Sequence, residues 1–395
     1  MKRISLFLLL FLLLKATVMY SQDGHPETNF RIVPVSPNAA SLGTYGLIPT
    51  DNYVGQARIS IPIYEIDLDG KKFPIALSYH TDGTRVAQEA TWIGLGWTLQ
   101  AGGCVVRQVQ GTDDFAARGC YNLTDAPWLT NPRFEVTDQN LEKYMGYFKG
   151  DYDAEPDMFY FNAGGHSGSM YFDVLKNNRQ LNAVPTIQTQ EKVVKMVYNT
   201  SNKTWTMTDL EGYVYSFSTK EITYYFLNTI DFFQTDITRS HIFPYYNEPQ
   251  IVTAWMLDSV TSPNGGKITF SYKKESIFTP ISTTEDVISL SKIVNGQLSS
   301  QSPQYFTNKF NYNYSYSKIE QWTLSAITFE GGKVEFGTTD REDIESAETG
   351  KKVQKLSSIK VSDTAGNLIK TTMLEYKYLL SGMAATTNGL SLIHI

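Results

Sequence analysis

The chain has 395 residues, a formal net charge of −6, 42% hydrophobic residues and 19% charged residues. This length allows a large buried core, and this composition excludes a generally disordered chain. The 25 Tyr, 21 Phe and 28 Gly residues favour pleated sheets and turns over helices. The negative charge and the lack of a Lys/Arg run argue against binding of nucleic acid, which needs a clustered basic face.

Residues 1–21 have the pattern of a secretory signal peptide. A basic start precedes an apolar run and a small-residue exit that ends near Ser21, with no cysteine nearby for lipid attachment. The apolar run is shorter than the roughly 20 residues that a membrane-spanning helix needs. We therefore expect an exported protein, secreted or exposed at the cell surface; a retained N-terminal anchor is the alternative.

Short runs of alternating apolar residues, broken by Gly, Asn and Asp, predict antiparallel hairpins. They cover residues 57–80, 155–173 and 205–218, and the first of them turns at Asp67–Gly70. A looser repeat follows, in which Leu-x-x-(Val/Ile) precedes a glycine-containing turn and a second strand. Its copies lie at 257–272, 324–338 and 356–376. The irregular spacing argues against a propeller and favours a long spiral or curled sheet.

Two stretches have the composition of less ordered connections. Residues 117–157 are expected to cross between sheets, with one short helix near 139–148, and the polar, Ser-rich residues 283–304 are expected to form a loop. Helical periodicity is almost absent after the N-terminal segment. The predicted fold class is therefore all-β, with successive antiparallel hairpins that form a curled sheet or partial β-shell and one or two short helices.

Residues 92–111 hold two tryptophans and five glycines, which raises the question of a ligand site. This stretch is not a dinucleotide fingerprint, because it lacks a third glycine at the proper spacing and a helix to follow it. We interpret it as a sharp strand corner that lets Trp92 and Trp97 pack. The residues of this structural motif are Gly94, Gly96, Trp97, Gly102, Gly103 and Arg107.

Three further features could carry chemistry, and each has an ordinary structural interpretation. Residues 164–169 nearly match the Gly-x-Ser-x-Gly elbow around Ser167, but Ser169 replaces the last glycine, and a strand rather than a helix follows. We interpret this stretch as a hairpin turn and keep a serine hydrolase as an alternative. Cys104 and Cys120 could form a disulfide, or Cys104 could pack as a small apolar residue; the spacing leaves both open.

The acidic residues of the crossing segment are weak candidates for a metal site. Alternate carboxylates can converge on calcium, but the glycine of a calcium loop is missing, and an acidic solvated turn is the usual outcome. No histidine has the spacing of a zinc ligand, and the sequence predicts no catalytic residue and no cofactor. The four candidate ligands are Asp151, Asp153, Glu155 and Asp157.

Several segments together form a fairly specific pattern: 36–49, 54–66, 73–86, 92–111, 155–168 and 262–272. They resemble the N-terminal part of secreted Rhs/YD-repeat proteins of the Bacteroidetes type, related to the N-terminal block of insecticidal-toxin and virulence-plasmid shell proteins. The resemblance covers most of residues 30–380. It implies a β-rich shell in which hairpins curl into a hollow cocoon around a C-terminal toxin or other payload.

The resemblance also implies that this chain is the front of a longer protein, because the repeat-rich middle, the motif that closes the shell and the cargo are missing. We therefore expect a secreted, non-enzymatic β-scaffold whose main partner is its own missing continuation. A carbohydrate-binding or adhesive module that stacks Tyr side chains on glycans or contacts target cells is the alternative. The oligomeric state stays open.

The expected division of the chain follows from these features. It comprises a signal peptide (1–21), a β-domain with the glycine-rich motif (22–115), a crossing segment (116–155), a hairpin region (156–250), YD-like repeats (251–389) and a tail (390–395). The tail fits no strand-turn pattern. It can be encoded by a transposon end used in DNA library preparation, so we interpret it as adapter sequence.

Overall fold

The computed structural model describes residues 33–47, 58–80, 89–111, 113–116, 119–120, 153, 155–173, 185–188, 194–231, 250–280, 282–290, 293–294, 297–298, 307–379 and 390–394. The predicted signal peptide, the predicted helix at 139–148 and most of the crossing segment lie outside the described residues. Within the described residues, no helix is both long and apolar enough to cross a membrane.

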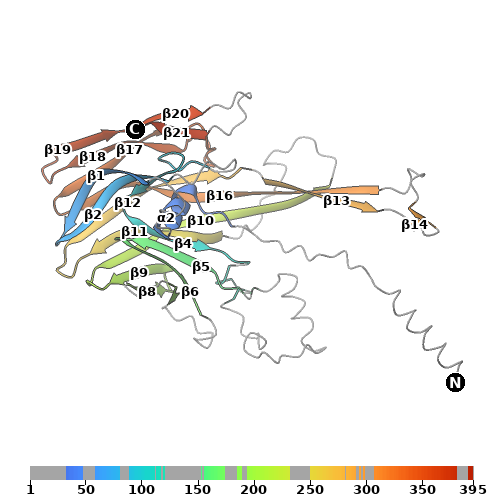
Figure 1. The fold of residues 1–395 in the computed structure, drawn as a ribbon, viewed down its shortest axis with the longest axis horizontal. Coiled ribbons are helices and arrows are strands. Elements are labelled where there is room, and N and C mark those ends of the chain that lie inside the picture. Colours follow the sequence, from blue (N-terminus) through green and yellow to red (C-terminus); the bar gives the residue numbers. More distant parts are fainter. Residues whose placement is uncertain are drawn as a thin grey trace, which may run out of the picture.

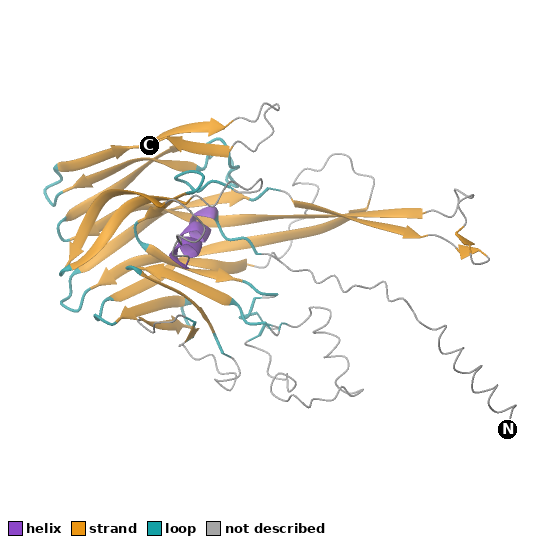
Figure 2. Ribbon diagram, viewed as in Figure 1, coloured by secondary structure: helices purple, strands orange, loops and turns teal. Residues whose placement is uncertain are grey.

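The described chain is nearly all β, and its strands wrap into a curled wall (Figures 1 and 2). A small sheet contains β1 (Arg58–Leu68), β2 (Lys71–His80) and β3 (Trp97–Gln100). A 14-stranded sheet forms the body, in which the order β19-β18-β17-β16-β10-β11-β4-β5-β6-β7 is joined by β8, β9, β12 and β13. Two two-stranded sheets, β14-β15 and β20-β21, complete the described strands.

The strands of the large sheet come from residues 103 to 373. Their bounds are β4 (Gly103–Gln108), β5 (Met158–Ala163), β6 (His166–Tyr171), β7 (Thr186–Ile187), β8 (Val194–Asn199), β9 (Thr204–Asp209), β10 (Val214–Asp231), β11 (Gln250–Thr261), β12 (Lys267–Phe278), β13 (Ser282–Leu290), β16 (Thr307–Phe329), β17 (Gly332–Asp340), β18 (Gln354–Ser362) and β19 (Leu368–Met373). The remaining strands are β14 (Ile293–Val294), β15 (Gln297–Leu298), β20 (Glu375–Leu379) and β21 (Leu390–His394).

All six predicted hairpins are present: β1-β2, β5-β6, β9-β10, β11-β12, β16-β17 and β18-β19, each antiparallel. The first turns at Asp69 and Gly70, which have φ values of 51° and 92°. Two consecutive residues with positive φ match the right-handed twist of the flanking strands, and Asp-Gly is a favoured pair for such a turn. The local turn chemistry therefore specified these hairpins.

The first hairpin departs from simple alternation. Its register shifts between Pro62 and Tyr64, and this irregularity changes which face of the strand each later residue occupies. Ile59 is 45% exposed, whereas Ile63 and Ile66 are buried. The bulge thus turns the second half of β1 toward the core.

A helix, α2 (Pro37–Leu47), occupies a segment for which the sequence showed no helical periodicity. The Ser36 hydroxyl accepts a hydrogen bond from the Ala39 amide at 3.2 Å, and Pro37 stands at the first helical position. Both are typical helix-start signals. The segment lacks the amphipathic spacing that predicts a helix from sequence, and carries helix-start signals instead.

The main core lies between the small sheet and the large one. Ile66, Ile75 and Leu77 of the small sheet belong to the same buried cluster as Val334 and Ile359 of the large sheet. Each sheet has one apolar face that it cannot bury alone, so the two cover each other.

Strands β4 and β11 are buried on both faces. Val105 and Trp255 belong to the main core, whereas their neighbours Cys104 and Met256 join a second cluster with Ala39 of α2. Because successive side chains of a strand point to opposite faces, α2 covers the side of these strands that the main core leaves open. This double burial explains the nearly continuous apolar run of β4.

Two expectations about the chain are wrong. Residues 283–304 were expected to form a loop, but β13 pairs with β16 from Ser282 to Leu290, and β14 and β15 follow. The tail was expected to fit no strand, but β21 pairs with β20. In both cases the hydrogen bonds come from a partner strand, which the local sequence does not signal.

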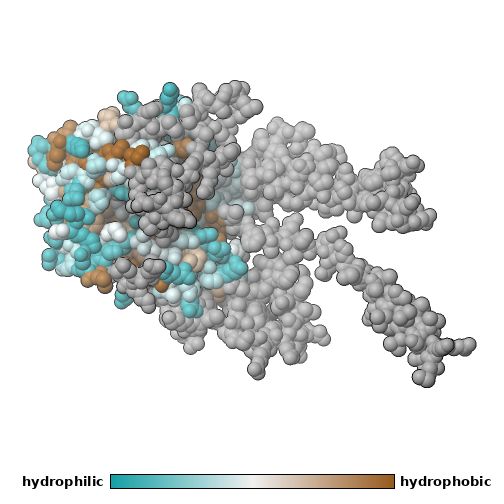
Figure 3. Space-filling view, viewed as in Figure 1, coloured by the Kyte–Doolittle hydropathy of each residue, from teal (hydrophilic) through white to brown (hydrophobic). Residues whose placement is uncertain are grey.

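Strand β19 forms one edge of the large sheet. Its exposed apolar side chains, Leu368, Ile369 and Met373, are 63%, 56% and 65% exposed. Figure 3 shows hydrophobic residues over the part of the surface where Figure 1 places β19. Lys370, which could protect the edge, instead donates from its Nζ to the Ile63 carbonyl of β1 at 2.9 Å.

Candidate functional site

The glycine-rich stretch forms a closed turn that leads into β3. Gly94 and Gly96 have φ values of 124° and 75°, which only glycine adopts readily. The Gly94 amide donates to the Thr91 carbonyl at 3.0 Å, and the Thr91 hydroxyl donates to the Trp97 carbonyl at 2.8 Å. The stretch therefore folds onto its own backbone groups rather than presenting them to a phosphate.

The two tryptophans of this turn pack on different neighbours. The Trp97 ring centroid lies 5.1 Å from that of Tyr79, and the Trp92 centroid lies 6.4 Å from that of Phe336. A Cβ at Gly96 would come within 2.8 Å of the Tyr79 ring, so glycine lets that ring approach. The turn thus connects β2 on one side with β17 on the other.

Gly103 allows a second close approach at the start of β4. A Cβ there would lie 2.5 Å from the Asn162 carbonyl oxygen and 2.6 Å from the Ala163 Cβ. Both contacts are shorter than real Cβ contacts, and one of them is to backbone. Strands β4 and β5 can pair at this distance only because position 103 has no side chain.

Arg107, the last motif residue, is buried among carboxylates. Its Nε donates to Asp157 Oδ2 at 2.8 Å, and its Nη2 contacts both Asp157 and Asp113. The guanidinium carbon lies 4.8 Å from the Phe115 ring centroid. With 2% of the arginine side chain and none of the Asp157 side chain exposed, this is a buried, charge-assisted pair.

A second carboxylate, Asp114, shares this buried site. The Asp114 amide donates to Asp157 Oδ2 at 3.3 Å, and the Asp157 amide donates back to Asp114 Oδ2 at 2.7 Å. Burial, followed by the nearby Asp157 charge, raises the pKa of Asp114 to about 9. Burial also raises the pKa of Asp157, but the Arg107 guanidinium opposes this. We therefore assign the proton to Asp114 and the negative charge to Asp157.

The structure describes three of the four candidate calcium ligands, and they do not converge on one point. Asp157 pairs with Arg107, Asp153 accepts the Glu155 amide at 3.0 Å, and Glu155 is exposed; Asp151 lies outside the described residues. No group of three or more His, Cys, Asp or Glu side chains in the described part of the chain could hold a metal ion.

The stretch around Ser167 forms a continuous strand. His166 and Ser167 are consecutive in β6, so their side chains point to opposite faces and cannot form a nucleophile–base pair. Ser167 borders a pocket of about 260 Å³ whose other lining includes Leu42, Phe73 and Phe270. The turn at 164–165 precedes the serine and leads into a strand, which is not the geometry of the elbow.

His166 instead faces Asp209, whose side chain is 1% exposed. The Asp209 Oδ2 atom lies 3.7 Å from His166 Nε2 and 2.5 Å from Lys71 Nζ, and it accepts the Tyr215 hydroxyl at 3.1 Å. Although burial acts against the charge of Lys71, hydrogen bonds to Asp209 and Glu211 outweigh it and raise the pKa of Lys71. Burial lowers the pKa of His166.

Three buried charged groups that the sequence did not single out hold elements together. Besides Asp209, Arg341 donates to the carbonyls of Ala90 and Thr91, both at 3.1 Å, and pairs with Asp343. Glu221 accepts the Ser36 amide at 2.9 Å, just before α2. The Lys71–Asp209, Ser36–Glu221 and Thr91–Arg341 contacts each join residues more than 130 positions apart. No local pattern could have revealed them.

Cys104 and Cys120 are both buried thiols in the structure, so the disulfide left open by the sequence is not formed. Burial raises the pKa of the Cys104 thiol far above its usual range, which makes it unreactive. Cys104 packs beneath α2, as the alternative interpretation of a small apolar residue expects.

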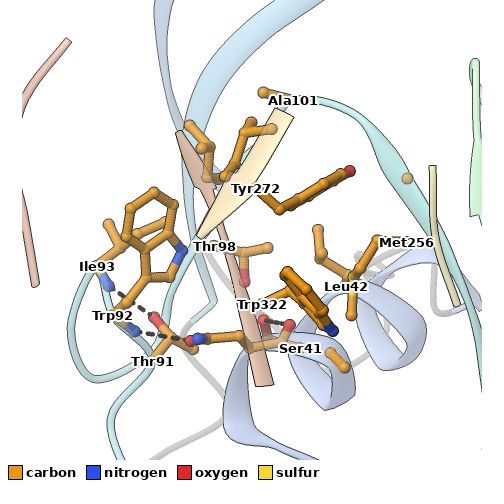
Figure 4. Close-up of a pocket in the computed structure, with 15 residues that line it drawn as sticks. Ser41, Leu42, Thr91, Trp92, Ile93, Thr98, Ala101, Met256, Tyr272 and Trp322 are labelled. Atoms are coloured by element: carbon orange, nitrogen blue, oxygen red, sulfur yellow. Dashed lines mark hydrogen bonds between the residues drawn. The ribbon is translucent and has the colours of Figure 1, made fainter. Parts of the chain in front are cut away.

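Two pockets border the motif: the 260 Å³ pocket beside Ser167, which Gly102 and Gly103 also line, and a smaller one. A pocket of about 30 Å³ lies between α2, the glycine-rich turn and β12, where Thr98, Tyr272 and Trp322 surround it (Figure 4). The Thr98 hydroxyl is buried and has no hydrogen-bond partner among the described residues. A volume of this size fits one water molecule and excludes a cofactor.

Comparison with known proteins gives matches to solved structures at low identity and low TM-score. No protein-family model and no curated protein matches the chain. The crystal structure of TcdB2-TccC3-Cdc42 is 10% identical with a TM-score of 0.36, and the match covers 82% of this chain and 14% of that one. The Photorhabdus luminescens Tc holotoxin pore is 9% identical with a TM-score of 0.37, covering 92% and 15%. The N-terminal domain of the effector SpvB from Salmonella typhimurium is 11% identical with a TM-score of 0.35, covering 81% and 93%.

The close approach at Gly103 gives a direct test of the motif as a packing element. We expect Gly103→Ala to lower the free energy of unfolding by about 2 kcal/mol, because the new methyl group overlaps the β5 backbone. Gly165→Ala is the control: its φ is positive but the space around it is open, so about 1 kcal/mol is expected. Urea denaturation of the purified chain measures both, and equal losses would contradict the packing role.

The proton on Asp114 predicts a pH dependence of stability. A folded pKa near 9, above the ordinary Asp value of about 4, means that the folded chain holds the extra proton and loses stability as pH rises between these values. Asp114→Asn mimics the protonated acid, so its free energy of unfolding should fall less steeply from pH 5 to 9, by up to about 1 kcal/mol per pH unit. The exposed Asp340→Asn should keep the wild-type slope; parallel profiles for all three chains would disprove the assignment.

Proposed function

We propose that this chain is a secreted, non-enzymatic β-scaffold and the N-terminal segment of a longer shell protein of the Rhs/YD-repeat type. Its role is to enclose or present a C-terminal payload. The chain spans 14% and 15% of the first two solved structures to which it is similar, so the role of any whole protein is part of this proposal.

The observation that carries the proposal is the way in which the motif residues are used. Gly96 and Gly103 admit a ring and a backbone, Trp92 and Trp97 pack on other aromatic rings, and Arg107 is enclosed by carboxylates. A ligand site would need some of these groups to converge on open space. Their engagement in packing supports a wall.

The architecture is compatible with enclosure. Most hairpins join a single large sheet, and register shifts in the β10-β11, β12-β16 and β17-β18 pairs bend it. Its last strands, β16, β17, β18 and β19, add in sequence order, and an edge built in this way can be lengthened by further hairpins without rearranging those before it.

The gene itself provides the first test. Long-read sequencing of the locus and of its transcript should show a reading frame that continues past residue 389 with more hairpin repeats and a distinct C-terminal region. A stop codon directly after Ile395 in clean genomic DNA would contradict the shell proposal.

The full-length product provides the second test. Its C-terminal region should resist a protease concentration about ten times higher than one that cleaves the same region expressed alone, because a shell excludes the protease. Equal cleavage would refute enclosure. Export is checked in the same cells, since the culture medium or cell surface should contain the protein and deletion of residues 2–21 should retain it inside.

The adhesive alternative has less support in the described residues. The strongly exposed large apolar side chains there are the aliphatic Ile59, Leu210, Leu368, Ile369 and Met373, whereas sugar stacking needs exposed aromatic rings. A glycan array with the purified chain distinguishes the two, because the scaffold should show no saturable binding. For the hydrolase alternative, we expect no labelling of Ser167 by an activated phosphonate.

A further inference from the structure

One ion pair joins the two sheets through unusually well buried partners. Lys71 begins β2 in the small sheet and Asp209 ends β9 in the large sheet, 138 positions later. The Lys71 Nζ lies 2.5 Å from Asp209 Oδ2, and the side chains are 16% and 1% exposed. Other lysine–carboxylate pairs of the described chain have a lysine that is at least 33% exposed, apart from the Lys71 contact with Glu211.

The two oxygens of Asp209 have different surroundings. Oδ1 accepts the backbone amides of Glu211 at 3.0 Å and Tyr213 at 2.9 Å. When a nucleophile adds to a carboxyl carbon, negative charge develops on the carboxyl oxygen. Two backbone amides that donate to this oxygen stabilise that charge. Oδ2 faces Lys71 Nζ and accepts the Tyr215 hydroxyl.

A second carboxylate and several rings complete the surroundings of the amine. Glu211 Oε2 lies 2.9 Å from Lys71 Nζ and is positioned to take a proton from it. The Tyr213 ring centroid is 4.9 Å from Nζ, and the Phe73 centroid is 6.4 Å from those of both Tyr213 and Tyr215. The rings limit access of water to the pair.

We propose that Lys71 and Asp209 condense to form an intramolecular isopeptide bond between the two sheets. The Lys71 ammonium loses one proton to Glu211, which passes it to Asp209 Oδ2, and the free amine then attacks Cγ of the neutral acid. The resulting oxyanion at Oδ1 is held by the two amides. The Cγ–Oδ2 bond then breaks, and Oδ2 leaves as water with the proton from Glu211 and the second proton from Nζ.

This condensation needs no oxidant, reductant or cofactor, since one ammonium and one carboxylate become one amide and one water. Lys71 has a raised pKa, and its hydrogen bond lowers the pKa of Asp209 against the effect of burial, so the reaction starts from the ion pair and a proton must leave Lys71 before it attacks. Proximity accelerates the reaction, because groups that a fold holds in reactive contact react as if at effective concentrations of about 10⁵ M or more. The bond can form only after folding, which brings the two positions together.

The decisive measurement is mass spectrometry of the purified full chain. We expect a tryptic species in which the peptide holding Lys71 is joined to the peptide holding Asp209, about 18 Da lighter than their sum because one water is lost. Peptide masses are used because removal of N-terminal residues would also change the intact mass. If the wild-type chain yields only the two separate peptides, the proposal is overturned, whether or not any variant folds.

Variants assign the roles. Lys71→Met and Asp209→Ala should abolish the joined species, and Glu211→Gln, at a residue 65% exposed, should reduce its yield at least tenfold with unchanged circular dichroism. Lys274→Met is the matched control, because Lys274 pairs with Glu320 at 2.7 Å but is 46% exposed; it should retain the full yield. An unchanged yield in Glu211→Gln would remove Glu211 as the base and overturn the mechanism.

Discussion

A large antiparallel sheet can satisfy its backbone hydrogen bonds internally, but its apolar face must be covered, and this constraint shapes the whole molecule. The small sheet β1-β2-β3 covers it, so that Ile66 and Leu77 share one core with Val334 and Ile359. Burial of such side chains stabilises a fold by about 1.5–3 kcal/mol each. The glycine-rich corner matters because it delivers β3 and then β4 into these two layers within a dozen residues.

The buried charged residues follow from the same arrangement. Backbone hydrogen bonds hold the strands of each sheet together, but they do not fix the position of one sheet relative to the other. Arg341 and Asp209 act at those junctions: the first binds carbonyls of the glycine-rich turn from β17's end, and the second receives Lys71 from the small sheet. A buried ion pair contributes little net stability, but removing one partner is costly, so such pairs favour one arrangement over others.

The cluster of Arg107, Asp114 and Asp157 fixes the two ends of the crossing segment against the sheet. Asp114 and Asp157 stand on either side of that segment and bond to each other's amides, while Arg107 from β4 neutralises one of them. The base of the segment is thereby attached to the sheet. The acidic pattern that suggested calcium is explained in part by this arrangement, in which a guanidinium occupies the place beside Asp157.

The sequence alone determined the hairpins, because a turn and a two-residue alternation are local properties that the chain carries with it. Asp69-Gly70 and the Leu-x-x-(Val/Ile) repeats therefore predicted strand pairs correctly. Tertiary structure decided what depends on distant partners: that polar residues 282–290 form β13 against β16, that α2 covers β4 and β11, and that Lys71 meets Asp209. These contacts are set by how the layers pack, and packing has no signature in a short stretch of sequence.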